Sequence, residues 1–293
     1  MKGLIVKALS GFYYVRPDNG VKVVQCRARG IFRNEGKKPL VGDYVEYSVT
    51  TDDEGIVDEI LERKNSFIRP PVANIDNLVI VISLKNPKIV PLVVDKLLVT
   101  AEQQSVRPVI CINKLDITET KELENFKSIY EDIYDVAIVS TTSKDGFDEL
   151  KQILLEEGRD VKTALAGPSG VGKSSIMNVL LGEDIVPVDV INAKMNRGNH
   201  TTRHIEIFDT EFGYIFDTPG FTTLDIKDID EMELDKYFPE IRESSKNCQY
   251  TNCSHIDEIG CNVFKDVEEE IINENRYNSY KQIYKAILEE KEY

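Results

Sequence analysis

One stretch decides the fold of this chain: Lys162-Thr163-Ala164-Leu165-Ala166-Gly167-Pro168-Ser169-Gly170-Val171-Gly172-Lys173-Ser174. Its first five residues predict a buried strand and the residues after Ser174 predict a helix, so the loop between them matches G-x-x-x-x-G-K-[ST] in its strand–loop–helix context. Glycines let the backbone fold tightly around phosphates with its N–H groups pointing inward, and a helix N-terminus favours anions. The stretch predicts a phosphate-binding P-loop; an unrelated turn is the alternative.

The residues on both sides of this loop alternate between strands and helices. Continuous apolar runs are typical of buried parallel strands, and a segment with helical spacing lies between the first two runs, at 95–104. Strands are predicted at 78–82, 108–112, 135–139 and 213–216. Together with the loop they predict a doubly wound α/β domain over residues 72–230.

A base-reading motif, Asn113-Lys114-Leu115-Asp116, follows one of these apolar runs. The Asp116 carboxylate can accept from N1–H and the exocyclic amine of guanine, whereas adenine lacks that amine. The stem of Lys114 is expected to pack along the base, and Asn113 to tie neighbouring loops together. Ser140 and Thr141 follow the next strand and are expected to close the base pocket through backbone N–H groups. A solvated turn is the alternative for each motif.

Two further segments indicate a switch that responds to the γ-phosphate. Asp217-Thr218-Pro219-Gly220 ends a strand, so Asp217 is expected to hold Mg²⁺ and Gly220 to turn its N–H toward the γ-phosphate. His200-Thr201-Thr202 lies in a glycine-containing stretch that suits a segment ordered by nucleotide, and Thr202 is expected to add its hydroxyl to the Mg²⁺ shell. A plain turn and a solvated loop are the alternatives.

The predicted site therefore binds GTP with Mg²⁺, with Lys173 neutralising charge on the β- and γ-phosphates as a catalytic residue. The magnesium ligands are Ser174, Thr202 and Asp217. The GTP-binding residues are Asn113, Lys114, Asp116, Ser140, Thr141, Gly167, Pro168, Ser169, Gly170, Val171, Gly172, Lys173, Ser174, Ser175, Thr201, Thr202, Asp217 and Gly220.

The order of the motifs along the chain is unusual. The base reader comes first, the P-loop second and Asp217 third, whereas ordinary small GTPases begin with the P-loop. The same site can form if the chain is circularly permuted, because loops at strand ends meet in space whatever their order. In that arrangement the segment ending at Gly220 leads directly into the C-terminal region.

The N-terminal region, residues 1–68, predicts a small β-barrel. It holds short runs rich in β-branched and aromatic residues, separated by turn signals at 18–20 and 53–55. An OB-type barrel, a fold that often binds nucleic acid, is one candidate, and a β-domain without a ligand is the other. Six basic residues oppose only Glu35 within 22–38 and predict a local basic patch: Lys22, Arg27, Arg29, Arg33, Lys37 and Lys38.

The C-terminal region, residues 231–293, predicts a mainly helical zinc-binding domain. Cys248-x₄-Cys253-x-His255-x₅-Cys261 supplies three thiolates and one imidazole, which suit one closed, tetrahedral, structural Zn²⁺ site. Four unrelated residues are the alternative. Tyr277, Tyr280, Tyr284 and Ile287 recur at spacings of three and four, which predicts core packing along one face of a helix.

Composition bounds the class of protein. The net charge of −15 argues against a general nucleic-acid binder, although residues 1–68 carry 11 Lys/Arg against 10 Asp/Glu. No apolar run approaches the ~18 residues of a membrane span, and the N-terminus does not resemble a signal peptide. We therefore expect a cytoplasmic protein with no membrane partner, and we expect a monomer.

The whole arrangement resembles the RsgA family of circularly permuted GTPases that depend on the small ribosomal subunit. The shared features are Val41-Gly42-Asp43, Arg69-Pro70-Pro71 with Ala73-Asn74-Ile75-Asp76, the permuted motifs, His200-Thr201-Thr202, the Cys/His cluster and Arg276-Tyr277-Asn278-Ser279-Tyr280. The resemblance implies an OB-fold, a permuted GTPase domain and a zinc domain. It also implies GTP hydrolysis stimulated by the small ribosomal subunit, binding to its rRNA and a role in its late maturation.

Catalysis is expected to depend on a partner. Phe221 follows the Asp217–Gly220 motif where many GTPases carry a glutamine that orients water, so intrinsic turnover should be slow. The resemblance makes His200 a candidate to position water; a merely solvated histidine is the alternative. Two other functions remain open: a permuted GTPase of large-subunit assembly, and a non-enzymatic RNA-binding zinc protein.

Overall fold

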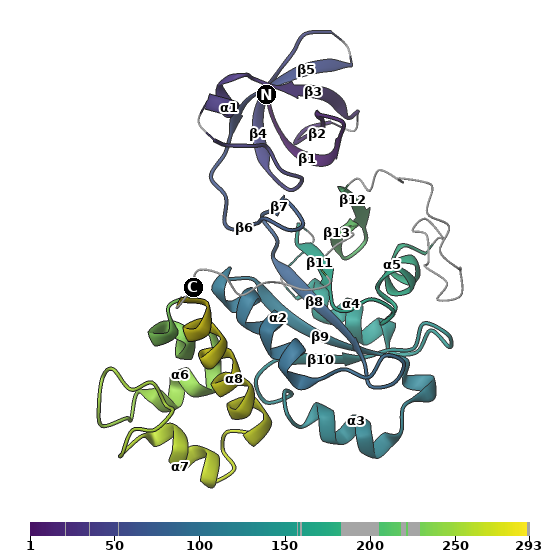
Figure 1. Ribbon diagram of the computed structural model, residues 1–293. Coiled ribbons are helices and arrows are strands. Elements are labelled where there is room, and N and C mark those ends of the chain that lie inside the picture. Colours follow the sequence, from purple (N-terminus) through teal and green to yellow (C-terminus); the bar gives the residue numbers. More distant parts are fainter. Residues whose placement is uncertain are drawn as a thin grey trace, which may run out of the picture. The chain divides into compact units, whose positions relative to one another are not determined.

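The computed structural model describes residues 1–20, 22–34, 36–51, 53–156, 158, 160–182, 205–217, 221 and 229–291 (Figure 1). They form two compact units, each assembled from separate segments of the chain. The first unit comprises Met1–Val79, Phe147–Ala166 and Gly172–Thr222, and the second comprises Ile80–Gly146, Gly167–Val171 and Thr223–Tyr293.

A five-stranded barrel occupies the start of the first unit, as predicted. The strands follow the order β1-β2-β3-β5-β4, and pairing of β4 with β1 closes the barrel. Buried residues alternate with more exposed ones along β2 to β5, and Ile5, Val15 and Cys26 are fully buried, so the barrel interior is a packed core. The elements are β1 (Lys2–Leu9), β2 (Phe12–Pro17), β3 (Val24–Ala28), α1 (Ile31–Asn34), β4 (Tyr44–Val49) and β5 (Glu54–Ile60).

The rest of the first unit is α/β. A short hairpin follows the barrel, and three strands lie in the order β11-β13-β12, with β11 parallel to β13 and β13 antiparallel to β12. The barrel strand β1 pairs with β12 through Lys7 and Glu206. The elements are β6 (Ser66–Phe67), β7 (Val72–Ala73), α4 (Phe147–Leu155), β11 (Lys162–Ala166), α5 (Lys173–Leu181), β12 (Ile205–Thr210) and β13 (Gly213–Asp217).

The second unit holds the other half of the α/β fold. Strand β8 starts in the first unit and ends in the second, and every one of its residues is buried, as expected of a central parallel strand. Strands β9 and β10 pair in parallel, with Ile112 beside Ile138. The elements are β8 (Asn77–Ser83), α2 (Pro91–Gln103), β9 (Arg107–Asn113), the 3₁₀ turn η1 (Leu115–Ile117), α3 (Thr120–Lys127) and β10 (Asp135–Ile138).

The C-terminal helices share a core with α2 in this unit. Val99 of α2 packs in one apolar cluster with Phe238, Ile241 and Ile283. The predicted aromatic stripe is confirmed as core packing, because Tyr277, Tyr280 and Ile287 are buried in the cluster and Tyr284 packs against it. The elements are η2 (Glu231–Tyr237), α6 (Pro239–Ser245), α7 (Asn262–Glu268) and α8 (Glu274–Lys291).

A buried arginine joins three of these helices. Arg276 of α8 donates to Asp95 of α2 across 2.6 Å and to Glu240 of α6 across 2.7 Å. Its guanidinium also lies over the ring of Phe238, 4.6 Å from the centroid. Arg276 is fully buried, so its charge is balanced by these two carboxylates in a site that water does not reach. Among the described residues, no helix is both long enough and apolar enough to cross a membrane.

Candidate active site

The predicted phosphate loop leaves β11 and enters α5, as its strand–loop–helix context requires. Gly167 has a φ of 131°, and a Cβ there would lie 3.1 Å from the carbonyl carbon of Val81 and closer still to its oxygen. Only glycine fits this conformation and this approach. At the other end of the loop, the Gly172 carbonyl accepts from Ile176 N across 2.8 Å, which closes the first turn of α5.

Lys173 and Ser174 are the first two residues of α5 and both are half-buried. Burial lowers the pKa of the Lys173 ammonium, because a charge is less stable away from water. A phosphate anion beside the ammonium would favour its charged form. Ser175 follows in the same turn and is also half-buried, while Ser169 of the loop is exposed.

The end of β9 is tied directly to the phosphate loop. Asn113 is fully buried, and its side-chain Nδ2 donates to the backbone carbonyl of Val171 across 2.8 Å. Its Oδ1 accepts from Lys114 N across 2.8 Å, so both ends of the amide are used. Segments far apart in the sequence are therefore fixed beside each other by one buried side chain.

Lys114 makes a second connection to the same loop. Its backbone lies in the left-handed region, with a φ of 69°, and its Nζ donates to the Gly170 carbonyl across 2.9 Å. The ammonium also donates to the carbonyl of Asn86, in the turn that follows β8. The sequence analysis did not select Asn86; the only signal was its place in a polar turn at a strand end.

Asp116 and Ser140 also meet. The Ser140 hydroxyl donates to Asp116 Oδ1 across 2.7 Å, and Ser140 itself is fully buried. This contact follows from the parallel pairing of β9 and β10, which continues one residue beyond β10, where Val139 N donates to Ile112 O across 2.8 Å. Asp116 is exposed, so its carboxylate is open to a ligand while one oxygen is held. Thr141, the next residue after Ser140, is half-buried.

Asp217 is the last residue of β13 and is half-buried. Strand β13 runs parallel to β11, with Phe216 beside Ala164, so Asp217 ends β13 at the same edge at which the phosphate loop follows β11. The remaining predicted switch residues, His200, Thr201, Thr202 and Gly220, lie outside the described residues. Phe221 is described and is fully buried.

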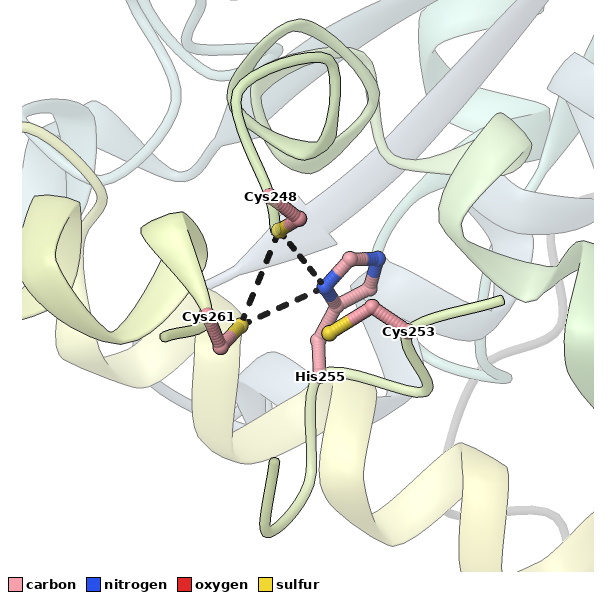
Figure 2. Close-up of side chains that lie close together, drawn as sticks. All are labelled: Cys248, Cys253, His255 and Cys261. Atoms are coloured by element: carbon pink, nitrogen blue, oxygen red, sulfur yellow. Dashed lines mark hydrogen bonds between the residues drawn. The ribbon is translucent and has the colours of Figure 1, made fainter. Parts of the chain in front are cut away.

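The predicted metal ligands converge in the second unit (Figure 2). The ligand atoms of Cys248, Cys253, His255 and Cys261 all lie within 4.8 Å of one another. His255 Nδ1 lies 3.6 Å from Cys248 Sγ and 3.4 Å from Cys261 Sγ, and the two sulfur atoms are 3.9 Å apart. Zinc bound to sulfur at ~2.3 Å and to nitrogen at ~2.0 Å gives tetrahedral edges of about 3.5–3.8 Å. The cluster therefore fits a metal ion of this size.

The surrounding residues orient the cluster. His255 Nε2 lies 3.8 Å from Asp235 Oδ2, while its Nδ1 faces the sulfur atoms. A carboxylate behind a ligating histidine is the usual arrangement that fixes the ring. Tyr277 Oη donates to the His255 carbonyl across 2.8 Å, and Tyr280 Oη donates to Ser254 O across 2.9 Å. Helix α8 thereby holds the backbone of the ligand loop.

Glu258 stabilises the same loop. Its carboxylate accepts from Ser254 N across 2.6 Å, from Ile256 N across 3.1 Å and from Asp257 N across 3.3 Å. Partial burial raises the pKa of Glu258, but these donors outweigh that effect and lower it to about 2. The carboxylate therefore stays ionised at neutral pH. It accepts hydrogen bonds from backbone N–H groups of the loop that would otherwise need water as their partner.

The order of these motifs around one phosphate loop defines the chain as a circularly permuted P-loop GTPase. The sequence model of the RsgA GTPase domain matches residues 60–227, and that of the RsgA N-terminal domain matches residues 2–57. The chain belongs to the RsgA GTPase family.

Relatives match the chain over its full length. It is 41% identical to the protein named small ribosomal subunit biogenesis GTPase RsgA of Caldanaerobacter subterraneus subsp. tengcongensis, over 99% of this chain and 96% of that protein. It is 40% identical to the protein of the same name in Bacillus subtilis, over 99% of this chain and 98% of that one.

Two crystal structures share the fold. YjeQ from Thermotoga maritima is 32% identical, with a TM-score of 0.84 over 98% of both chains. YloQ, described as a circularly permuted GTPase, is 38% identical, with a TM-score of 0.81 over 99% of this chain and 95% of that one. The predicted permuted fold is thereby confirmed.

Proposed function

We propose that this GTPase hydrolyses GTP to GDP and phosphate under stimulation by the small ribosomal subunit, binds its rRNA and acts in its late maturation. The names of the full-length relatives support the ribosomal role. The observation that carries the nucleotide assignment is the hydrogen bond from Asn113 to the Val171 carbonyl, which joins the N-K-x-D motif to the phosphate loop.

The roles of the site residues follow from their chemistry. Asp116 accepts from the guanine edge while Ser140 holds one of its oxygens, and the stem of Lys114 lies along the base. Lys173 and the loop N–H groups bind the β- and γ-phosphates. Ser174, Thr202 and Asp217 hold Mg²⁺, which when bound neutralises charge on the phosphate oxygens. Gly220 donates its N–H to the γ-phosphate.

Activation of the attacking water is the step that is proposed to require the small ribosomal subunit. The buried Phe221 stands where many GTPases carry glutamine, and His200 is the proposed residue that positions water. Turnover should be slow for the isolated chain and fast with small subunits, and His200→Ala should lower only the stimulated rate. Fast turnover without subunits would contradict this proposal. Lys173→Ala should abolish tight GTP binding, so an unchanged affinity would show that the nucleotide site is elsewhere.

The metal held by the Cys/His cluster is proposed to be one structural Zn²⁺. Four protein ligands fill a tetrahedral shell and leave no position for a catalytic water. Freshly purified protein should contain one equivalent of zinc, and Cys261→Ser should lose it and lower the melting temperature. Cys111→Ala, at a buried thiol of β9 outside the cluster, should keep its zinc. Substoichiometric zinc in the wild type would contradict the assignment.

Contact with rRNA is proposed to begin on the barrel, at the predicted basic patch. Its charge is smaller than the sequence indicates, because Lys22 pairs with Asp53 and Arg29 pairs with Asp58. The side chains of Lys37 and Lys38 in the same patch are exposed to solvent. Co-sedimentation with each ribosomal subunit, in GDP and in a non-hydrolysable GTP analogue, tests both the partner and its nucleotide dependence. Binding to the large subunit alone would overturn the proposal.

The remaining proposals concern the state of the whole chain. We propose a cytoplasmic monomer with the three-part division 1–68, 72–230 and 231–293. Sedimentation analysis that finds a stable dimer would refute the monomer.

A further inference from the structure

Two buried phenylalanines flank the Asp217–Gly220 motif in the chain. Phe216 precedes Asp217 in β13 and is 1% exposed, and Phe221 follows Gly220 and is 0% exposed. Both side chains are therefore anchored in packed surroundings although the motif between them must meet a ligand. The residues that anchor them identify what positions the motif.

Phe221 packs against the hairpin that follows the barrel. Its ring lies 5.3 Å from the ring of Phe67, centroid to centroid, with an interplanar angle of 79°. This edge-to-face arrangement is the geometry that aromatic pairs prefer. Phe67 lies in β6, where it pairs with Val72 of β7, and is itself only 6% exposed.

Phe216 packs against the barrel loop that contains Gly42. A Cβ on Gly42 would lie 2.9 Å from Phe216 Cζ, and closer still to the Ala73 carbonyl oxygen. Gly42 also has a φ of 96°, so glycine is required both by its conformation and by the approach of the ring. The barrel backbone therefore lies directly against the residue before Asp217.

Gly42 and Phe67 belong to one connected piece of structure. Val41 forms a bridge with Val72, and Ala73 N donates to Val41 O across 3.0 Å. Asn74 Nδ2 donates to the Gly42 carbonyl across 2.9 Å. We call this piece, residues 41–42 with 66–74, the linker support. It contacts Phe216, the neighbour of Asp217, and Phe221, the described residue that follows the motif.

We infer that the linker support positions Asp217 for the Mg²⁺ that is bound with GTP, with Phe67 as the positioning residue. The inference rests on the role proposed above for Asp217. Packing that fixes the neighbour of a reacting group restricts the positions which that group can reach, which is how remote packing contributes to a reaction. GDP lacks the γ-phosphate, so Phe67 should matter for GTP and not for GDP.

The test measures the affinity of the full chain for GDP and for a non-hydrolysable GTP analogue. Each nucleotide is titrated into the protein in the presence of Mg²⁺. Phe67→Ala should lower the affinity for the analogue by about tenfold to a hundredfold, while GDP binds as in the wild type. Phe67→Leu keeps an apolar side chain and should recover most of the loss. Phe126→Ala is the matched control, because Phe126 is 7% exposed and packs in the second unit, with its ring centroid 5.1 Å from that of Tyr130.

Asp217→Asn separates this inference from the proposed function. In one outcome, Asp217→Asn lowers the affinity for the analogue while both Phe67 variants keep the wild-type ratio of analogue affinity to GDP affinity. In that case the inference is wrong and the role of Asp217 stands. If Asp217→Asn changes nothing, the proposed role of Asp217 fails and the inference fails with it. A general loss of folding would lower the affinities for GDP and for the analogue together. If Phe67→Ala does not fold, Phe67→Leu is compared with the wild type instead.

Discussion

Asn113 donates a hydrogen bond from its side-chain amide to the backbone carbonyl of Val171 across 2.8 Å. The bond joins the end of β9 to the phosphate loop, and Lys114 adds a parallel connection to Gly170. In a permuted chain these segments arrive in an unusual order, yet the contact between them is direct. The contact brings the proposed base-reading motif to the phosphate loop, as binding of one nucleotide by both requires.

Asn113→Ala should weaken GDP and GTP binding equally. The substitution leaves the buried Val171 carbonyl without its donor, which costs about 1–3 kcal/mol, or roughly five- to 150-fold in affinity. Titration of both nucleotides measures the loss. Asn125→Ala, the same change at an exposed position of α3, should leave both affinities as they are. A loss confined to GTP would indicate a different role for Asn113.

Asp116→Asn should change the base that is bound. The amide no longer accepts from both guanine donors, so GTP affinity should fall by about a hundredfold. Xanthine carries a carbonyl in place of the exocyclic amine, and the new amide can donate to it, so xanthosine triphosphate should bind better than GTP. Competition between the two nucleotides measures the exchange. Asp132→Asn, at an exposed position of the same unit, serves as the control, and an unchanged preference for GTP would show that Asp116 does not read the base.

Arg276→Met should destabilise the second unit strongly. Removal of the guanidinium leaves Asp95 as an uncompensated buried carboxylate, which costs about 3–5 kcal/mol of unfolding free energy. Urea unfolding measures the loss, and the double variant Arg276→Met with Asp95→Leu should regain a large part of it. Arg242→Met, at an exposed position of α6, should change the unfolding free energy little. If the double variant is as unstable as the single one, the buried charge is not the cause.

Glu258→Gln should show a defined pH dependence. Because the folded pKa of Glu258 is lowered to about 2, its charge stabilises the folded chain at every pH above its ordinary value of 4.5. This contribution is lost as the pH falls from 4.5 to about 2. At pH 7 the variant should be less stable by about 1 kcal/mol, after allowance for solvent screening of a partly exposed carboxylate.

The measurement is urea unfolding of the wild type and of Glu258→Gln across this pH range. A chelator is present throughout, so that release of the metal in acid does not contribute to the difference in unfolding free energy. The two proteins should converge at the acid end. Glu268→Gln, at an exposed position of α7, should match the wild type at every pH. A constant difference between Glu258→Gln and the wild type at all pH values would mean that the charge is not what stabilises the loop.

Local signals made the strand–loop–helix unit and the Cys/His cluster predictable from the sequence. The phosphate loop combines its own motif with a strand before it and a helix after it, all within one short stretch. The Cys and His ligands are close in the chain, so their spacing limits where they can lie. The buried parallel strands were likewise predictable from continuous apolar runs, because such runs need burial on both faces.

Contacts between distant segments were not predictable in the same way. Arg69-Pro70-Pro71 was interpreted as a linker, whereas the residues on either side of it form the β6–β7 hairpin that carries Phe67. A count of charges within residues 22–38 also missed the acidic partners of Lys22 and Arg29. These partners, Asp53 and Asp58, are distant in the sequence and are brought beside the basic residues by strand pairing. Strand β12 has the sequence Ile-Glu-Ile-Phe-Asp-Thr, in which strict apolar/polar alternation breaks between Ile207 and Phe208, so its signal was weak.

The pairing of β1 with β12 has a consequence for truncation of the chain. Lys7 and Glu206 face each other there and form an ion pair of 2.7 Å, so β1 covers the outer side of β12 at its first two residues. Without residues 1–68, the amides and carbonyls on that side would be open, and a second copy of the chain could add a strand to them. Removal of the barrel is therefore expected to favour self-association through this edge.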